Sequence, residues 1–198
     1  MSQYHARTVV ILLAAVLVTA ACARDEAETT ADTAAAVVTP DTTQLAAGVR
    51  RGPARDADHE FLRMMSDHHQ GLVTMATAAM NSGSTPQARD DAFAVGQKQD
   101  LEMRQMVELI QTAYGEAIEP TIMSSHRAMN DSLQALTGVQ YDRTFYRMIA
   151  QHHREGIAMM DDFQSRVQRP EVRQMIDRMR VEQQREIQEF ERKAAGAT

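Results

Sequence analysis

The chain contains one segment twice, and this internal repeat constrains its fold more than any other feature of the sequence. The pair His68-His69 is followed by the pair His152-His153 at an offset of 84 residues. Without a gap, the same offset matches Asp58 with Asp142, Phe61 with Phe145, Arg63 with Arg147, Met64 with Met148, Met75 with Met159, Pro86 with Pro170, Arg89 with Arg173, Gln99 with Gln183 and Glu102 with Glu186. A register that holds over this length predicts one helix-plus-helix unit used in tandem.

Helix-forming residues fill the two repeats, and turn residues divide them into four long segments. We expect helices over about residues 58–80, 86–114, 142–167 and 170–193. Asp58 is a candidate N-cap of the first helix, and residues 123–136 form a less regular connection with some helical character that Gly138 ends. No alternating strand pattern occurs. The sequence therefore predicts an all-α protein, a four-helix, ferritin-like bundle built from two tandem helix pairs with one longer crossover.

The first 22 residues have the composition of an export signal. The apolar run 9–18 is too short to span a bilayer, which takes a helix of about 20 residues, and small residues follow it. Cys22, the one cysteine of the chain, lies where a bacterial lipobox has its lipid-bearing cysteine. Thr19 stands where that motif usually has leucine, and the sequence around Ala21 also fits ordinary cleavage, so simple secretion stays open. We expect an exported protein of the bacterial cell envelope or periplasm, lipid-anchored to the membrane at Cys22.

Residues 23–57 are rich in Ala, Thr, Asp and Glu without apolar periodicity, a composition typical of a disordered tether. The remaining residues, 58–198, are numerous enough to bury a single core and are predicted to form one domain. The net charge of −6 and the lack of a basic patch with interleaved aromatic residues argue against nucleic acid as a partner. A homo-oligomer of this domain stays open.

Methionine and histidine share one stripe of the first predicted helix. At about 100° per residue, Met64, His68 and Met75 fall within roughly 40° of one another. At a rise of about 1.5 Å per residue, His68 lies roughly 6 Å from Met64 and roughly 10 Å from Met75, so one ion cannot contact all three. One Met-x3-His pair from each repeat would instead give a His2Met2 site made of Met64, His68, Met148 and His152.

The second histidine of each repeat and two glutamates are further candidates. His69 and His153 point about 100° away from the stripe, so we expect them to serve another role or another face. Glu102 and Glu186 lie at matching positions of the second helix in each repeat, and each could accept a hydrogen bond from a metal-binding imidazole. The alternatives are solvated surface glutamates and, for the methionines of the deeper layer, simple core packing.

The donor atoms favour copper. Thioether sulfur is a soft donor that selects Cu(I), while imidazole suits copper, zinc, iron and nickel. Every methionine other than Met1 lies between residues 64 and 179, the same part of the chain as the paired histidines. A weaker, secondary candidate site lies in the predicted crossover and consists of Met123, His126 and Met129.

The doubled motif resembles the domain-of-unknown-function family numbered 305, which includes CopM-like copper-binding proteins. Two Asp-x2-Phe-x2-Met-x3-His-His-x5-Met segments, each followed by a Gln-x2-Glu helix, carry the resemblance over about residues 58–190. The resemblance implies a ferritin-like bundle that is exported, with copper or silver binding and metal resistance in some members. The chain departs from its own repeat at Gly71, where the second unit has Glu155. By matching position, the resemblance implies the candidate ligands Met64, His68, His69, Met75, Met148, His152, His153 and Met159.

We therefore expect a metal-binding protein, with copper as Cu(I), or silver, bound for sequestration, homeostasis or resistance. A di-iron oxidase on the same fold would need Glu-x-x-His motifs, which neither repeat has. No nucleophile elbow, phosphate-binding glycine loop or Cys-x-x-Cys occurs, so we expect no enzyme activity. A metal-free helical module that binds another protein at the envelope stays open.

Overall fold

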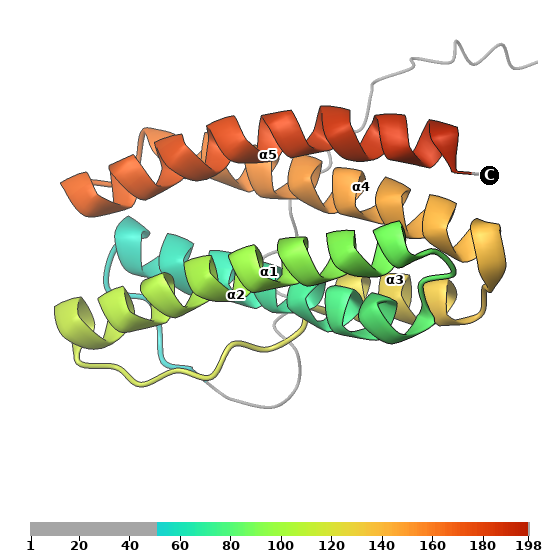
Figure 1. Ribbon diagram of the computed structural model, residues 1–198. Helices are drawn as coiled ribbons and strands as arrows, with labels where there is room; N and C mark the ends of the chain where they lie inside the picture. Colours follow the sequence, from blue (N-terminus) through green and yellow to red (C-terminus); the bar gives the residue numbers. More distant parts are fainter. Residues whose placement is uncertain (1–50, 198) are drawn as a thin grey trace, which may run out of the picture. The chain divides into compact units, whose positions relative to one another are not determined.

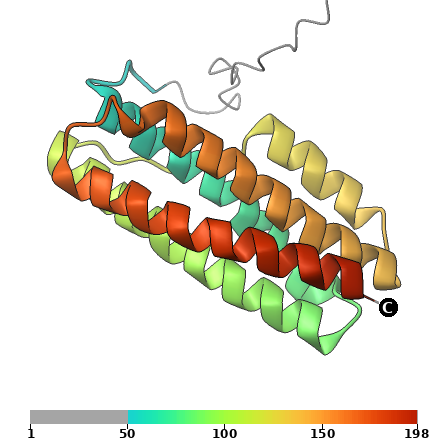
Figure 2. The same ribbon diagram turned by 90° about the horizontal axis from the view of Figure 1, so that it is seen from above.

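Five helices make up the computed structural model, which describes residues 51–197. They are α1 (Ala57–Ser82), α2 (Pro86–Tyr114), α3 (Ser124–Gln134), α4 (Gly138–Gln164) and α5 (Pro170–Gly196). The four long helices lie along one another in a bundle, and the short α3 lies beside α1 and α4 on the connection from α2 to α4 (Figures 1 and 2). No strand occurs in residues 51–197, so the prediction of an all-α fold is confirmed.

The ends of α2 follow the local signals in the sequence. Pro86 is the first residue, the side chain of Thr85 accepts a hydrogen bond from the backbone amide of Ala88, and Gly115 ends the helix with a left-handed φ of 66°. Proline and a capping threonine commonly mark the start of a helix, and glycine commonly marks its end. The predicted bounds of α2 therefore match the observed ones. The crossover is more regular than we expected, because α3 is a helix of 11 residues.

Asp58 is not the N-cap of α1, and that prediction is wrong. Asp56 caps the helix by accepting a hydrogen bond of 2.8 Å from the backbone amide of His59. The carboxylate of Asp58 instead accepts hydrogen bonds of 3.0–3.1 Å from the backbone amides of Gln168 and Arg169, in the loop between α4 and α5. Asp58 can accept hydrogen bonds from these loop amides because the loop lies against the start of α1.

Asp142, the counterpart of Asp58, makes the reciprocal contact from α4. Its carboxylate accepts hydrogen bonds of 2.6–3.1 Å from the backbone amides and hydroxyls of Ser84 and Thr85, in the loop between α1 and α2. Each helix pair thus holds the turn of the other pair, and the start of α1 lies near the end of α4. This antiparallel, reciprocal arrangement is what two equivalent units related by an approximate two-fold axis would produce.

The core divides into two apolar clusters. One is rich in alanine and aromatic side chains and includes Tyr141, Phe145 and Phe190; we call it the aromatic cluster. The other, the methionine cluster, contains the buried residues Met65, Met103, Met106, Met160, Met175 and Met179. On each long helix, buried polar residues lie between the two clusters. This polar layer consists of His68, His69, Gln99, His152, His153, Gln183 and Glu186.

The residues before α1 contact the bundle from Arg51 onward. The Arg51 guanidinium forms two hydrogen bonds of 2.8 and 3.0 Å with the carboxylate of Asp67 and a third with the carbonyl of Glu119. The last part of the predicted tether is therefore fixed to the domain. The export signal, Cys22 and the tether up to residue 50 lie outside the described residues. Within residues 51–197, no helix has an apolar stretch that would let it cross a membrane.

Candidate metal centre

Three buried histidines from three different helices meet within the polar layer. His68 of α1, His126 of α3 and His152 of α4 each offer a ring nitrogen, and these atoms lie within 4.8 Å of one another. The rings of His68 and His152 are stacked at 3.8 Å between centroids, and the His126 ring lies 4.8 and 4.7 Å from them. Their exposed fractions are 1%, 4% and 0% in chain order. We call these three residues the histidine triad.

Hydrogen bonds decide which nitrogen of each ring is available. Nε2 of His68 donates to the backbone carbonyl of His152 at 3.2 Å, and Nε2 of His152 donates to the carbonyl of His68 at 3.0 Å. A carbonyl oxygen only accepts, so both Nε2 atoms carry the hydrogen and both Nδ1 atoms keep a lone pair. Nε2 of His126 lies 3.3 Å from Oε2 of Glu155. Nδ1 of His126 and Nδ1 of His152 are buried without a hydrogen-bond partner.

His126 reaches the triad because of its place on α3 and because residue 71 has no side chain. His126, Asn130 and Leu133 are the buried residues of α3 and follow a helical spacing, so this short helix turns one face to the bundle. A Cβ atom at Gly71 would lie 2.3 Å from Nδ1 of His126, a distance that real Cβ contacts do not show. Any larger residue at position 71 would push the imidazole out of its place.

Two members of the triad, His68 and His152, are held in the unprotonated form near neutral pH. Burial holds the pKa values of His68 and His152 well below the ordinary value of 6.5, and positive charge on neighbouring histidines would lower both further. A metal ion needs the unprotonated ring nitrogen, so this environment keeps His68 and His152 in the form that binds. Burying imidazoles whose lone pairs lack a partner is unfavourable in the absence of a ligand.

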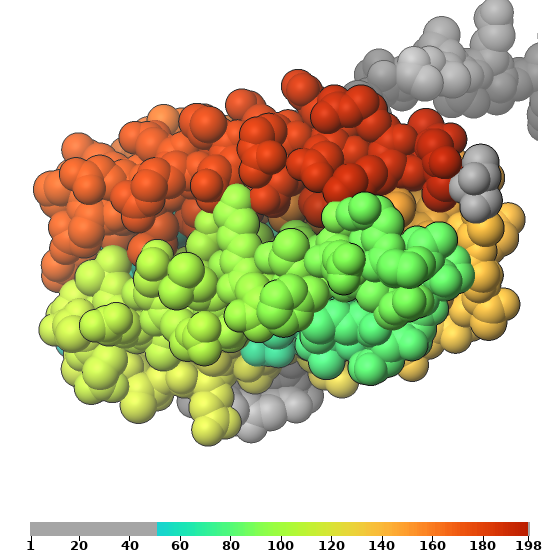
Figure 3. Space-filling view, in the orientation of Figure 1, coloured from blue at the N-terminus to red at the C-terminus, as the bar shows by residue number. Residues whose placement is uncertain are grey.

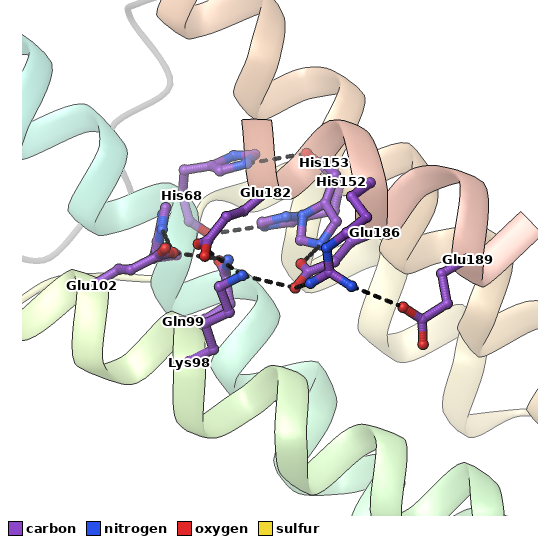
Figure 4. A network of polar contacts seen from close by, with 11 residues as sticks. His68, Lys98, Gln99, Glu102, His152, His153, Glu182, Glu186 and Glu189 are labelled. Atoms are coloured by element: carbon purple, nitrogen blue, oxygen red, sulfur yellow. Dashed lines mark hydrogen bonds and ion pairs between the residues drawn. The ribbon is translucent and has the colours of Figure 1, made fainter. Parts of the chain in front are cut away.

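The second histidine of each repeat contacts a glutamate of the neighbouring helix. Figure 4 labels His153 and Glu186 of one pair and Glu102 of the other. Nδ1 of His69 donates to the carbonyl of Met65 at 3.0 Å, and its Nε2 lies 3.0 Å from Oε2 of Glu102. Nε2 of His153 lies 2.9 Å from Oε2 of Glu186. Glu102 and Glu186 therefore face His69 and His153 directly, and these four residues link α1 to α2 and α4 to α5.

Lys98 distinguishes the two histidine–glutamate pairs. Its Nζ lies 2.9 Å from Oε1 of Glu186 and 2.8 Å from Oε2 of Glu182. These two ion pairs connect α2 to α5. Burial alone would raise the pKa of Glu186, but the contacts with His153 and Lys98 lower it to about 2. Side chains of α2 and α5 cover this face of the bundle (Figure 3). The polar layer is thus closed on this side by charged residues that neutralise one another.

The methionines of the expected His2Met2 site lie on different sides of the polar layer. Met64 and Met159 pack on the methionine cluster, whereas Met75 and Met148 belong to or pack on the aromatic cluster. Because α1 and α4 are antiparallel, the residue four positions before the histidine lies in opposite directions on the two helices. The structure therefore brings His68 and His152 together and does not bring Met64 and Met148 together.

The crossover residues also separate. His126 joins the triad, Met129 packs against the aromatic cluster, and Met123 is the N-cap residue of α3. Sequence reasoning had assigned His126 to a secondary site and missed its contact with the two repeats. One signal was present, because Gly71 replaces the glutamate of the second repeat at the point where an imidazole needs space.

Comparisons with known proteins agree with this fold. CopM in its Cu(II)-bound form is 24% identical, with a TM-score of 0.61 over 70% of this chain and 95% of that chain. A DUF305 fragment from Deinococcus radiodurans is 25% identical, with a TM-score of 0.63 over 73% and 99%. No curated protein matches. The model of the family described as "Domain of unknown function (DUF305)" matches residues 15–110 and 58–194. The chain therefore belongs to the DUF305 family.

Proposed function

We propose that this protein binds a copper ion with Nδ1 of His68, His126 and His152. The observation that carries the proposal is the histidine triad itself, in which three buried imidazoles converge and two of their Nδ1 atoms have no hydrogen-bond partner. An unpartnered buried polar group costs about 1–3 kcal/mol, and a bound ion would remove this cost. Imidazole nitrogen is a common ligand of copper, zinc, iron and nickel, so the donor set fits a metal of this group.

Two arguments favour copper, and Cu(I) in particular, within this group. An imidazole that binds through its lone pair brings no negative charge to offset that of the ion, and an ion of charge +1 loses less hydration energy on burial than a divalent ion does. CopM, which shares the fold, has been solved in Cu(I)-bound, Cu(II)-bound and Ag-bound forms. Silver is therefore a further candidate ion. Thioethers of Met64 and Met148 adjoin the polar layer from its two sides and are candidates for a secondary contribution to selectivity.

The test is a competition titration of Cu(I) against a chelator of known affinity, using the purified protein. We expect His68→Ala with His152→Ala to weaken binding by more than 100-fold. The matched control changes His69 and His153 to alanine, because these histidines are adjacent in sequence and equally buried. The proposal would be contradicted if the control variant lost as much Cu(I) affinity as the triad variant, or if the triad variant kept the affinity of the wild type. A melting temperature that copper leaves unchanged would favour a metal-free helical module that binds another envelope protein.

We further propose that the protein acts outside the cytoplasm, where it sequesters copper for homeostasis or resistance. The proposal rests on the export signal and on the lipobox-like sequence that ends at Cys22. If Cys22 carries a lipid, Cys22→Ser should release the protein from the membrane fraction or block its processing. Membrane association that still requires detergent in this variant would contradict the lipid anchor and leave copper binding untouched.

A further inference from the structure

The two repeats differ at one matched pair of positions that face the same residue. Gly71 of the first repeat and Glu155 of the second are separated by the repeat offset of 84 residues. Gly71 leaves the space that the His126 ring fills, since an added Cβ would lie 2.3–2.8 Å from three atoms of that side chain. Glu155 lies on the other side, with Oε2 3.3 Å from Nε2 of His126. Both departures from the repeat therefore serve one histidine.

Glu155 is itself held in position at the edge of the bundle. Its Oε1 accepts a hydrogen bond of 2.9 Å from Nε2 of Gln151, one turn earlier on α4. Its side chain is 40% exposed, whereas the His126 side chain is 3% exposed. Glu155 therefore reaches from the surface to the outer nitrogen of a buried ring. A carboxylate in this position accepts a hydrogen bond and cannot donate one when ionised.

We propose that Glu155 is a positioning residue that holds His126 in its Nε2–H tautomer and so makes Nδ1 the metal ligand. A neutral imidazole carries one hydrogen, and the oxygen acceptor at Nε2 decides which nitrogen keeps it. With the hydrogen on Nδ1 instead, that nitrogen of His126 would be a hydrogen-bond donor and could not bind an ion. This inference rests on the proposed function for its consequence, but the tautomer itself exists without metal.

The other two triad members do not depend on a side chain in this way. Nε2 of His68 and Nε2 of His152 donate to backbone carbonyls, which no substitution removes. Among the three groups that face the Nε2 atoms of the triad, Glu155 is a side chain and the other two are backbone carbonyls. A substitution at Glu155 can therefore change the tautomer of His126. Carboxylates that hold a metal-binding histidine from outside typically change metal affinity about 10–100-fold when they are removed.

The test measures the His126 tautomer in the metal-free protein by long-range ¹H–¹⁵N NMR, and Cu(I) affinity in parallel. We expect Glu155→Ala to shift His126 away from the Nε2–H form and to weaken Cu(I) binding about 10–100-fold. Glu155→Gln keeps an oxygen acceptor and should restore the tautomer and most of the affinity. The matched control is Asp162→Ala, an exposed carboxylate two turns further along the same face of α4.

The outcomes separate this inference from the proposed function. A His126 ring that stays in the Nε2–H form in Glu155→Ala overturns the inference, whether or not the protein binds copper. A tautomer that shifts in Glu155→Ala and returns in Glu155→Gln upholds the positioning role, even if Cu(I) affinity does not depend on the triad. An equal loss of affinity in Asp162→Ala would reduce the effect of Glu155 to surface charge and would also overturn the inference.

Discussion

The two helix pairs carry the same residues where they hold each other together and different residues where the crossover helix docks. Asp58 and Asp142 bind the turns of opposite pairs, and His68 and His152 exchange hydrogen bonds with each other's carbonyls. Gly71 and Glu155 differ, and both face His126. Matched positions thus build a frame that brings His68 and His152 together, while unmatched positions make room for a third histidine.

The largest effect on stability is expected at the aspartates of the frame. Asp142→Ala removes four hydrogen bonds to the loop of Ser84 and Thr85, and Asp58→Ala removes the contacts to two backbone amides. Because a hydrogen bond to a charged group contributes about 1.5–3 kcal/mol, we expect a loss of at least about 3 kcal/mol for Asp142 and at least about 2 kcal/mol for Asp58. Urea unfolding of both variants measures the difference. If each variant lost less than about 0.5 kcal/mol of unfolding free energy, these carboxylates would not be what holds the two helix pairs together.

Acid should destabilise the metal-free protein through the two matched histidines. The folded pKa values of His68 and His152 lie well below 6.5, so below this pH the unfolded chain takes up protons that the folded protein does not. This contribution to stability is therefore complete above about pH 7.5 and decreases as the pH falls through 6.5. Two such groups give a slope of up to about 2.7 kcal/mol per pH unit.

Unfolding in urea at a series of pH values from 7.5 to 5 measures this slope. The variant with both His68→Gln and His152→Gln serves as the control, because it retains the other titrating groups of the chain. We expect the slope between pH 6.5 and 5.5 to be smaller in the control than in the wild type. The same slope in both proteins would show that the acid sensitivity arises elsewhere.

The unmatched glycine should matter less for stability and more for the site. Gly71→Ala forces the His126 ring to move, since the new Cβ would overlap it. We expect a loss of about 1–3 kcal/mol from overpacking and faster hydrogen exchange in Ser124–Gln134. Gly156→Ala is the comparison for α3, because its added Cβ would meet the Gln183 side chain and Nε2 of His68, and neither residue belongs to α3. If the amides of α3 exchanged at the same rate in both variants, Gly71 would not be the residue that makes room for His126.

The smallest effect is expected at the matched methionines. Met64→Leu and Met148→Leu conserve volume at partly buried positions, so each should change stability by less than about 1.5 kcal/mol. Because the two side chains lie on opposite sides of the polar layer, we expect Cu(I) affinity to change far less than with the triad variants. Competition among Cu(I), Cu(II) and zinc measures any shift in preference. A loss as large as that of the triad variants would restore the methionines as principal ligands.

Local signals in the sequence predicted much of the frame. Pro86 and Gly115 mark the ends of α2, and the gap-free offset predicted that His68 and His152 approach each other. The choice of Asp58 as N-cap was wrong, because its partner is a loop more than 100 residues away, which no local pattern reveals. The predicted His2Met2 site did not take into account the relative direction of the two Met-x3-His pairs. Antiparallel packing separates their sulfur atoms, and the path of the crossover supplies His126 instead.

The position of His126 on the crossover has a consequence for the chain as a polymer. The sequence has one cysteine, Cys22, so no internal disulfide can fasten α3 to the bundle. An ion held by the triad would join three helices that are distant in sequence and would act as a reversible cross-link. Its contribution would grow with free copper, by about 1.4 kcal/mol for each tenfold rise above the dissociation constant. How firmly the crossover is attached would then depend on the metal concentration around the protein.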